Sequence, residues 1–550
     1  MAVRAWCGER GLTPERLDDT EKGFLGVRLQ GATRSWDLFV DCDEKRLKIP
    51  KVKLGQPCGL LAHVGYSGTV CVNDGQNMSV DIDRKPDIVA HTLLEAFDLV
   101  ERSVADTTTG RAEFFNELEG YWSGQPGWSR ARITFEVDQR DRLITAYVNA
   151  KKPSKTWCLS ERNQPLPKEL EGDGLAAQRA LYVHLNEVPL PPAHPDRLTV
   201  SFVEEVKAKL SPTQLELWAQ LVGPSKNGPK LLTVLISVPR AAGGNSLIGV
   251  AFTAKGGQID SRMPVMPLTI RRHTTSYMRE RGGAPLELLS KHVAVLGCGA
   301  VGSVVADCLA AAGVGKLTLV DLDEFSEDNV FRHLLGPIWV DIPKVSALRI
   351  HLTNRYPGLK VVSINDAAQE WMDPKSLAGI DGIVIAFGQP SVERSFSRYF
   401  RDTTLAMPVV FTWLEALDLG GHSVLSWTNA EGCLECLYRD DEGRPALAPR
   451  SSFMEPGQPV TRNLTGCGSI FVPFGALQAR RTGLMAAEHL LTALGKPSPA
   501  SYRFWVGEGD AAAEAGLRTT PWHKIAAGLS QAEATRRVFG RPCKHCRIQA

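Results

Sequence analysis

The sequence has no hydrophobic run that reaches the ~20 residues needed by a membrane-spanning helix. Its 63 basic and 61 acidic side chains give a net charge of +2 without long blocks of one sign, so no nucleic-acid or membrane partner is indicated. There is no internal repeat, no low-complexity tract and no uninterrupted apolar segment of the secretory-signal type near residue 1. We therefore expect a cytoplasmic protein of several domains, because 550 residues exceed what one hydrophobic core usually organises.

Cysteine, in contrast, is plentiful, with 12 residues, and in a cytoplasmic chain this indicates thiol chemistry or metal ligation rather than a disulfide scaffold. Two Cys-x2-Cys pairs stand more than a hundred residues apart, Cys433 with Cys436 and Cys543 with Cys546. Each pair can bind one metal ion through two thiolates, so together they predict a tetrahedral Zn²⁺ site. Since all four ligands come from the protein, we expect this zinc to be structural and not catalytic.

The first 100 residues have strand-like segments at 24–31, 35–42 and 47–52, followed by a helical pattern over 87–106. Further along, residues 131–138 and 142–150 predict a hairpin around a polar turn, and 198–203, 230–238 and 246–254 predict strands. A helix capped by Ser211 is expected after them. From about residue 286 the pattern changes to alternating strands and helices, which is typical of a parallel α/β sheet.

The first strand of this α/β region runs into a glycine turn formed by Gly297, Gly299 and Gly302. The first glycine permits a tight turn, the second lets a phosphate approach the backbone, and the third lets the following helix pack close to the strand. Asp321 ends the next strand, where an acid can bind a ribose hydroxyl. The pattern predicts a nucleotide site without identifying the nucleotide.

Asn329, Arg332 and Lys344 follow Asp321, and two cations with an amide suit a triphosphate better than hydride transfer. This spacing resembles the ATP-binding motif of the adenylating family that includes ubiquitin-activating enzymes and the bacterial ThiF and MoeB proteins. The resemblance implies that Asp321 binds the ribose of ATP, that Arg332 and Lys344 bind its phosphates, and that Asn329 helps to hold the triphosphate.

One position departs from this family. An aspartate that holds Mg²⁺ commonly follows the strand at 382–386, whereas Gly388 or Gln389 stands near that position here. A carboxamide is a weaker metal ligand than a carboxylate, so Mg²⁺ would be held differently, with Asp323 as a candidate, or adenylation would be slower. The family also has a helix that can donate an arginine to the ATP site of a dimer mate; Arg279 or Arg281 could do so, or both are ordinary surface arginines.

Cys467 lies between glycines and before a predicted helix, whose N-terminus would favour the thiolate. In related activating enzymes a cysteine after the first zinc pair receives the carrier protein as a thioester, and ThiF and MoeB carry the same two cysteine pairs. The resemblance therefore implies that Cys467 is a nucleophile. Cys298 and Cys308 fall in the glycine loop and its helix, where packing explains them better.

A thioester on Cys467 needs an acceptor, and Cys71 lies in a loop between the predicted strands and helix of the first 100 residues. The segment with His63, Gly68 and Cys71 resembles the active-site segment of bacterial ubiquitin-conjugating-like domains. The asparagine that stabilises the oxyanion in eukaryotic relatives is absent; Asn73 could supply an amide donor. His63 would order the loop or act as a base.

The combined resemblance is to the fused enzymes of bacterial ubiquitin-like systems, including the Cap-type fusion of cyclic-oligonucleotide antiphage signalling and the Bub and Bil enzymes. It implies an α+β conjugating-like domain at 1–125, a mixed α+β linker domain at 126–285 and a Rossmann-like adenylation domain at 286–550. The expected activity is ATP- and Mg²⁺-dependent adenylation of the C-terminal carboxylate of a ubiquitin-like protein or similar carrier, with capture on Cys467, transfer to Cys71 and conjugation to an amine of a protein target. A homodimer through the adenylation domain is expected, and antiphage defence is the implied setting.

Three alternatives remain. A sulfur-carrier adenylyltransferase would explain residues 286–550 but leave Cys71 unused, and a nucleotide-binding scaffold is suggested by the missing aspartate. A nicotinamide dehydrogenase is disfavoured by Arg332, Lys344 and the cysteine pairs.

Overall fold

The structure is a computed structural model that describes residues 1–550 except 19–22, 44–47, 56–58, 74–77, 150–156, 173, 224–227, 404, 465–469, 541 and 547–550. The chain divides into two compact units, Met1–Thr274 and Thr275–Ala550. Each unit is mixed α/β and has its own buried apolar clusters. The division into three domains at 125 and 285 stays a prediction.

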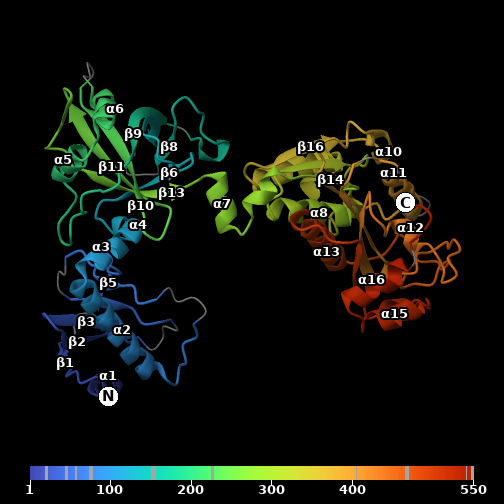
Figure 1. Ribbon diagram of the computed structural model, residues 1–550, viewed down its shortest axis with the longest axis horizontal. Helices are drawn as coiled ribbons and strands as arrows, with labels where there is room; N and C mark the ends of the chain where they lie inside the picture. Colours follow the sequence, from blue (N-terminus) through green and yellow to red (C-terminus); the bar gives the residue numbers. More distant parts are fainter. Residues whose placement is uncertain are drawn as a thin grey trace. The chain divides into compact units, whose positions relative to one another are not determined.

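Unit 1 begins with an antiparallel five-stranded sheet in the order β1-β2-β3-β4-β5. Helix α2 (Lys85–Ala105) carries a stripe of buried residues, among them Leu93 and Val100, that packs on this sheet (Figure 1). The remaining elements of this part are α1 (Ala2–Glu9), β1 (Glu15–Leu17), β2 (Phe24–Gln30), β3 (Ser35–Asp41), β4 (Val52–Leu54) and β5 (Thr69–Val70). A small antiparallel sheet followed by a long helix agrees with the α+β fold predicted for this part.

The second part of unit 1 is a mixed sheet in the order β10-β9-β7-β8-β6-β13-β11-β12, and an additional pairing of β10 with β11 closes it on itself. Inward-facing side chains such as Trp157 and Leu235 fill the closed sheet, while α4, α5 and α6 cover apolar side chains on its outside. The elements are α3 (Thr107–Asn116), α4 (Leu118–Ser123), β6 (Ser129–Ile133), β7 (Arg142–Asn149), β8 (Trp157–Glu161), η1 (Lys168–Leu170), β9 (Leu175–His184), α5 (Val200–Ala208), α6 (Pro212–Val222), β10 (Lys230–Pro239), β11 (Asn245–Lys255), β12 (Gln258–Ile259) and β13 (Met266–Arg272).

Two local predictions for this region are wrong. β6 and β7 do not form a hairpin, because β6 pairs with β8 and β13 whereas β7 pairs with β8 and β9. Residues 198–203 are not a strand, since α5 begins at Val200 and buries Phe202, Val203 and Val206 on one face. The helix capped by Ser211 is confirmed as α6, with a capping box to Gln214.

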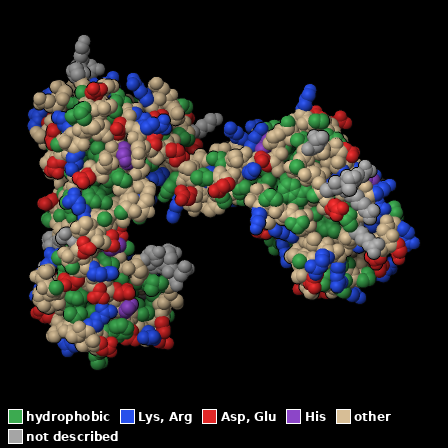
Figure 2. Space-filling model, in the orientation of Figure 1, with side chains coloured by type: hydrophobic (Ala, Val, Ile, Leu, Met, Phe, Trp, Pro, Cys, Tyr) green, Lys and Arg blue, Asp and Glu red, His purple; other side chains and the backbone are tan. Residues whose placement is uncertain are grey.

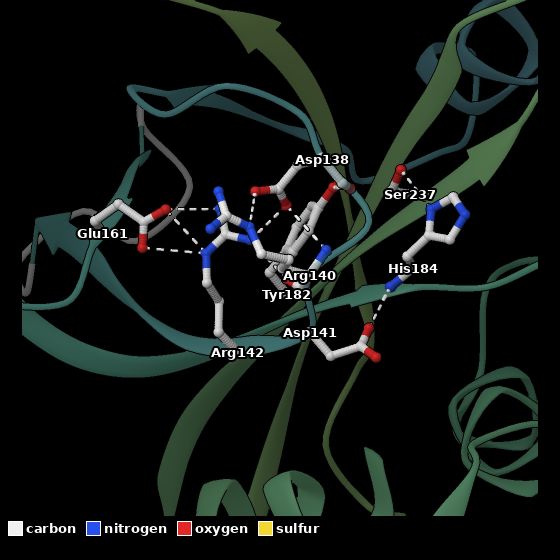
Figure 3. Close-up of polar contacts among 8 residues, drawn as sticks. All are labelled: Asp138, Arg140, Asp141, Arg142, Glu161, Tyr182, His184 and Ser237. Carbon is white, nitrogen blue, oxygen red and sulfur yellow. Dashed lines mark hydrogen bonds and ion pairs between the residues drawn. The ribbon is translucent and has the colours of Figure 1, made fainter. Parts of the chain in front are cut away.

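A charged cluster lies at one end of the closed sheet (Figure 3). Arg142 bonds Asp138 and Glu161, both at 2.6 Å, and its guanidinium lies over the Phe135 and Tyr182 rings. Burial alone would raise the pKa of Asp138, but hydrogen bonds from Arg142 and Arg140 hold it below its usual value. The cluster satisfies its own charges, so we assign it to stabilising this end of the sheet rather than to chemistry.

Unit 2 contains a seven-stranded sheet in the order β16-β15-β14-β17-β18-β19-β22. The strands from β16 to β18 are parallel, and β19 and β22 add antiparallel pairings. The chain runs outward from β14 through β15 to β16 and then returns to β17, which places a topological switch point between β14 (His292–Leu296) and β17 (Gly382–Ile385). Ligands of open α/β sheets bind at the carboxyl ends of the strands at such a point.

The remaining elements of unit 2 include the other strands of this sheet (Figure 1). They are α7 (Thr275–Arg281), η2 (Leu286–Ser290), α8 (Ala300–Ala311), β15 (Lys316–Val320), η3 (Glu327–Asn329), η4 (Pro337–Trp339), α9 (Lys344–Arg355), β16 (Lys360–Ile364), α10 (Ala368–Trp371), α11 (Pro390–Arg401), β18 (Pro408–Leu414), η5 (Ala416–Asp418), β19 (Gly420–Trp427), α12 (Leu434–Leu437), β20 (Arg462–Asn463), β21 (Ile470–Phe471), α13 (Ala476–Gly495), β22 (Ser501–Val506), α14 (Asp510–Glu514), α15 (Pro521–Ala526) and α16 (Gln531–Phe539).

Within the described ranges, no helix has the length and apolar character needed to cross a membrane. Figure 2 shows acidic and basic side chains interspersed on the face drawn, as the near-balanced composition predicts.

Candidate nucleotide and thiol sites

The glycine turn at the end of β14 has the predicted geometry. Gly297 has φ +84°, and a Cβ there would lie 2.9 Å from the Ala386 carbonyl oxygen at the end of β17. Gly299 is the N-cap of α8, and a Cβ on Gly302 would overlap the Gly297 carbonyl oxygen. The glycines therefore let β14, α8 and the β17 loop meet closely at the switch point, where the N–H groups that begin α8 can bind an anion.

Asp321 follows β15 and holds the glycine turn. Its carboxylate accepts the backbone N–H of Cys298 at 2.6 Å and of Asp323 at 2.8 Å. Burial raises the pKa of Asp321, and these two hydrogen bonds oppose the rise. The carboxylate thus lies beside the predicted phosphate-binding turn, in the place expected for a ribose-binding acid.

Lys344 is the first residue of α9 and is buried, and its ammonium bonds the Asp323 carboxylate at 2.7 Å. The Lys344 backbone N–H also donates to the Asp323 carbonyl at 3.0 Å. Asp323 is therefore the ion-pair partner of the lysine. The structure brings this pair together with Asp321 and the glycine turn through consecutive hydrogen bonds.

The segment between β15 and α9 carries the other two predicted residues. The Asn329 side-chain oxygen accepts from the Ser326 N–H and hydroxyl in a capping box that closes η3. The Arg332 guanidinium lies 5.3 Å from the centre of the Phe474 ring, which precedes α13. Asn329 thus has a local structural role, and Arg332 contacts the segment that follows residues 465–469.

His333 was not predicted, and it connects this segment to the glycine turn. Its Nε2 bonds the Cys298 carbonyl at 2.7 Å, and its Nδ1 accepts the Leu335 N–H at 3.1 Å. Because Nδ1 accepts, Nε2 must donate, so the ring is neutral; burial lowers the pKa of His333 to about 4. Only its position beside Arg332 could have drawn attention to it in the sequence.

Gln389, near the position of the family's metal-binding aspartate, is exposed and is the N-cap of α11. Beneath it, buried Glu393 accepts the Gly388 N–H at 2.9 Å, and burial raises the pKa of Glu393 to about 7. Around the turn, the carboxylates of Asp321, Asp323 and Glu393 are all engaged by backbone N–H groups or by Lys344. Each carboxylate oxygen has more than one lone pair, and the Asp323 side chain is 60% exposed, so Asp323 stays the candidate Mg²⁺ ligand.

The four paired cysteines meet in one buried cluster in which all sulfurs lie within 4.8 Å of one another. The Sγ–Sγ distances are 3.6 Å for Cys433 with Cys543 and 3.3 Å for Cys436 with Cys546. A disulfide would need about 2 Å, whereas four thiolates at Zn–S bonds of about 2.3 Å stand roughly 3.8 Å apart. The residues therefore fit a tetrahedral zinc ion, as the spacing predicted.

The remaining cysteines differ in exposure. Burial raises the pKa of Cys298 well above its usual value and that of Cys308 to about 11, so both stay protonated and are explained by packing. Cys467 lies outside the described residues. Cys71, in unit 1, is exposed.

Cys71 and His63 lie opposite each other at the end of β5. The Cys71 N–H donates to the His63 carbonyl at 2.7 Å, next to a bridge between Val64 and Val70. Gly68, with φ +80°, closes the intervening turn, where a Cβ would lie 3.0 Å from the Leu54 carbonyl oxygen. The local fold therefore presents the thiol on a tightly constrained loop.

His63 itself has φ +60°. It is held by Glu113 of α3 and by Glu117, the C-cap of that helix. Glu117 accepts the His63 N–H at 2.9 Å and contacts Nδ1 at 2.7 Å, and Glu113 lies 3.5 Å from Nε2. These contacts fix the orientation of the ring, and the choice between the two roles considered for His63 stays a prediction. Asn73 contacts the Cys71 sulfur through its main-chain carbonyl, at 3.9 Å.

Of the two arginines on α7, Arg279 donates to the Gly313 carbonyl within unit 2, whereas Arg281 is exposed. The first is thus engaged in its own subunit.

Residues 276–542 match the ThiF family. The chain is 26% identical over 236 residues to the ATP-dependent ubiquitin transferase-like protein Cap2 of Pseudomonas aeruginosa (strain BWHPSA011 / Pa011), covering 42% of this chain and 41% of that relative. It is 43% identical over 176 residues to the uncharacterized protein y4oA of Sinorhizobium fredii (strain NBRC 101917 / NGR234), covering 30% of each chain. A crystal structure of Escherichia coli MccB with MccA-N7isoASN matches with 18% identity and a TM-score of 0.32, covering 40% of this chain and 63% of that one.

The chain thus matches less than half the length of these curated relatives. The predicted Rossmann-like, ThiF-type fold is confirmed for the region that carries the glycine turn and the first cysteine pair. Residues 276–542, just under half of the chain, match the ThiF family, and the chain resembles the ubiquitin-activating-like proteins of the Cap type.

Proposed function

We propose that unit 2 adenylates the C-terminal carboxylate of a protein or peptide carrier. The observation that carries this proposal is the meeting of the glycine turn, Asp321 and the Lys344–Asp323 pair at the switch point of a ThiF-family sheet. A carboxylate oxygen of the carrier attacks the α-phosphorus of ATP, the bond to the bridging oxygen breaks, and pyrophosphate leaves. Reaction of two anions in this way requires fixed positive charge.

Each residue has a stated part in this step. The N–H groups that begin α8 bind phosphate oxygens, and Lys344 and Arg332 neutralise the departing pyrophosphate. Asp321 accepts a ribose hydroxyl with the lone pairs that its backbone contacts leave unused. Mg²⁺ enters as part of the substrate MgATP, held mainly by the phosphates, and the Asp323 carboxylate is the candidate protein ligand.

Thioester chemistry follows. The Cys467 thiolate attacks the acyl carbon and AMP leaves; the Cys71 thiolate then attacks the same carbon and releases Cys467. A target amine displaces Cys71 and loses a proton, which leaves an amide bond. The exposure of Cys71 and the constrained loop that presents it support its part in this scheme.

The wider setting is part of the same proposal, and the likeness to a ubiquitin transferase-like protein supports its ubiquitin-like carrier. We propose a ubiquitin-like carrier, a protein target, a homodimer through unit 2, a cytoplasmic location and a role in antiphage defence. Zinc at the cysteine cluster is structural and would hold the segment after α16 against α12 and its N-cap.

Pyrophosphate exchange tests the first step. Labelled pyrophosphate should enter ATP only when MgATP and a candidate carrier encoded by a neighbouring gene are present together. Lys344→Met should remove the exchange, while Lys360→Met, at an exposed site on β16, should leave it unchanged. No exchange with any candidate would contradict adenylation and favour a nucleotide-binding scaffold. If exchange occurs, and sulfide then displaces AMP from the acyl-adenylate without any need for Cys71, a sulfur-carrier enzyme would be favoured.

A further inference from the structure

Helix α11 presents three arginines to the cysteine cluster. Arg394, Arg398 and Arg401 are spaced by four and three residues, so they share one face of the helix. Arg394 and Arg398 both bond Glu435, which is 1% exposed and lies between the first two cysteines. Arg401 makes a different set of contacts.

The Arg401 guanidinium bonds four main-chain carbonyls from two distant segments. Its Nη1 donates to Trp427 at 2.8 Å and to Ala430 at 2.6 Å, just before the first cysteine pair. Its Nε and Nη2 donate to His545 and Cys546 of the second pair, both at 3.3 Å. One side chain therefore joins both halves of the cluster.

These contacts do not require a metal ion. Cys433 and Cys543 are 110 residues apart, so bringing them together lowers the entropy of the chain. If no other contact holds the two segments together, metal binding has to supply this free energy and the metal affinity is lower. A guanidinium suits this role because its planar fork donates several charge-assisted hydrogen bonds at once. It also places positive charge beside a cluster that carries a net charge of about −2 when four thiolates bind Zn²⁺.

We propose that Arg401 is a positioning residue that holds the second cysteine pair against the first before metal binds. The metal then meets a site whose two halves are already adjacent. The roles of Arg394 and Arg398 differ, since they fix the first pair alone through Glu435.

The test titrates Co²⁺ alone into the zinc-stripped full-length chain and follows the absorption bands of tetrahedral cobalt thiolate. Arg401→Lys keeps the charge but loses the fork, and we expect it to weaken Co²⁺ binding by about 10-fold or more, as for other residues that orient metal ligands. The matched control is Arg398→Lys, which leaves Arg394 on Glu435 and should bind Co²⁺ as the parent does. Equal affinities in the parent and Arg401→Lys would overturn the proposal, even if the melting temperature of the variant falls.

A second measurement needs no variant. Hydrogen exchange at residues 543–546 is compared in zinc-loaded and zinc-stripped parent protein. The proposal expects these amides to stay protected without zinc. Exchange at the rate of an unstructured peptide in the stripped parent would overturn it.

Discussion

The Lys344 ammonium and the Asp323 carboxylate form an ion pair at 2.7 Å in which the burial is unequal, because the lysine side chain is 9% exposed and the aspartate 60%. Losing the aspartate leaves a buried cation without its partner, whereas losing the lysine leaves a carboxylate that water can solvate. We therefore expect Asp323 to matter more for stability and Lys344 to matter more for binding the nucleotide.

Asp323→Ala should lower the free energy of unfolding of unit 2 by about 1–3 kcal/mol, the usual cost of an unpaired buried polar group. Lys344→Met should cost less but should abolish carrier-dependent pyrophosphate exchange. Urea denaturation and the exchange assay, run on both variants, check the two effects. Equal stability losses in the two variants would contradict the unequal burial.

His333 should make stability depend on pH. Its pKa in the folded state, about 4, lies below the usual value of about 6.5, so the unfolded chain binds a proton that the folded chain excludes. The contribution of neutral His333 to the free energy of unfolding is fully present above about pH 6.5. It is lost as the pH drops toward 4, by about 3 kcal/mol in total. His333→Gln, which can still donate and accept, should remove this fall and retain ATP binding. His333→Ala should raise the KM for ATP, because the Cys298 carbonyl loses its donor.

Glu393 should make stability fall as the pH rises, which is opposite to the effect of His333. Its folded-state pKa of about 7 exceeds the usual 4.5, so the folded chain binds the extra proton. Relative to Glu393→Gln, the parent should lose about 3 kcal/mol as the pH rises from about 4.5 to 7 and nothing further above that. Chemical denaturation at several pH values measures the difference between the two proteins. A difference that grows as the pH falls would contradict the assignment.

At the thiol site, Glu117→Ala should slow amine-dependent discharge of the Cys71 thioester by about 10-fold, because His63 loses contacts to its N–H and ring. A loop-ordering role predicts an unchanged pH profile for the residual rate, whereas loss of a general base would shift it. The control is His91→Ala, which removes an exposed ion pair with Glu95 on α2. The rates are measured by adding amine to the thioester, stopping samples at intervals and following loss of the adduct by non-reducing electrophoresis.

The sequence predicted those parts of the fold that are set by local sterics or by the spacing of metal ligands. The strand, glycine turn and helix around Gly297 follow from the steric needs of that turn, and the cysteine cluster follows from ligand spacing. The pairing of β6 with β13 could not be predicted, since strand partners distant in the chain are chosen by packing of the closed sheet. Residues 198–203 looked like a strand because Val200, Phe202 and Val203 favour strands, yet burial of one helical face decided their conformation.

Residues that act through the backbone also escaped prediction. His333, Glu393 and Arg401 bond main-chain groups of segments far away in the sequence or around a turn, and no residue pattern marks such a contact. They became visible only when the fold placed their partners beside them.

The most direct test of the whole account is non-reducing electrophoresis of the parent, Cys71→Ala and Cys467→Ala with MgATP and a labelled carrier encoded by a neighbouring gene. We expect thiol-labile adducts on the parent, an adduct confined to Cys467 in Cys71→Ala, and no adduct in Cys467→Ala. If both variants form the same adducts as the parent, the assignment of the two thiols is wrong.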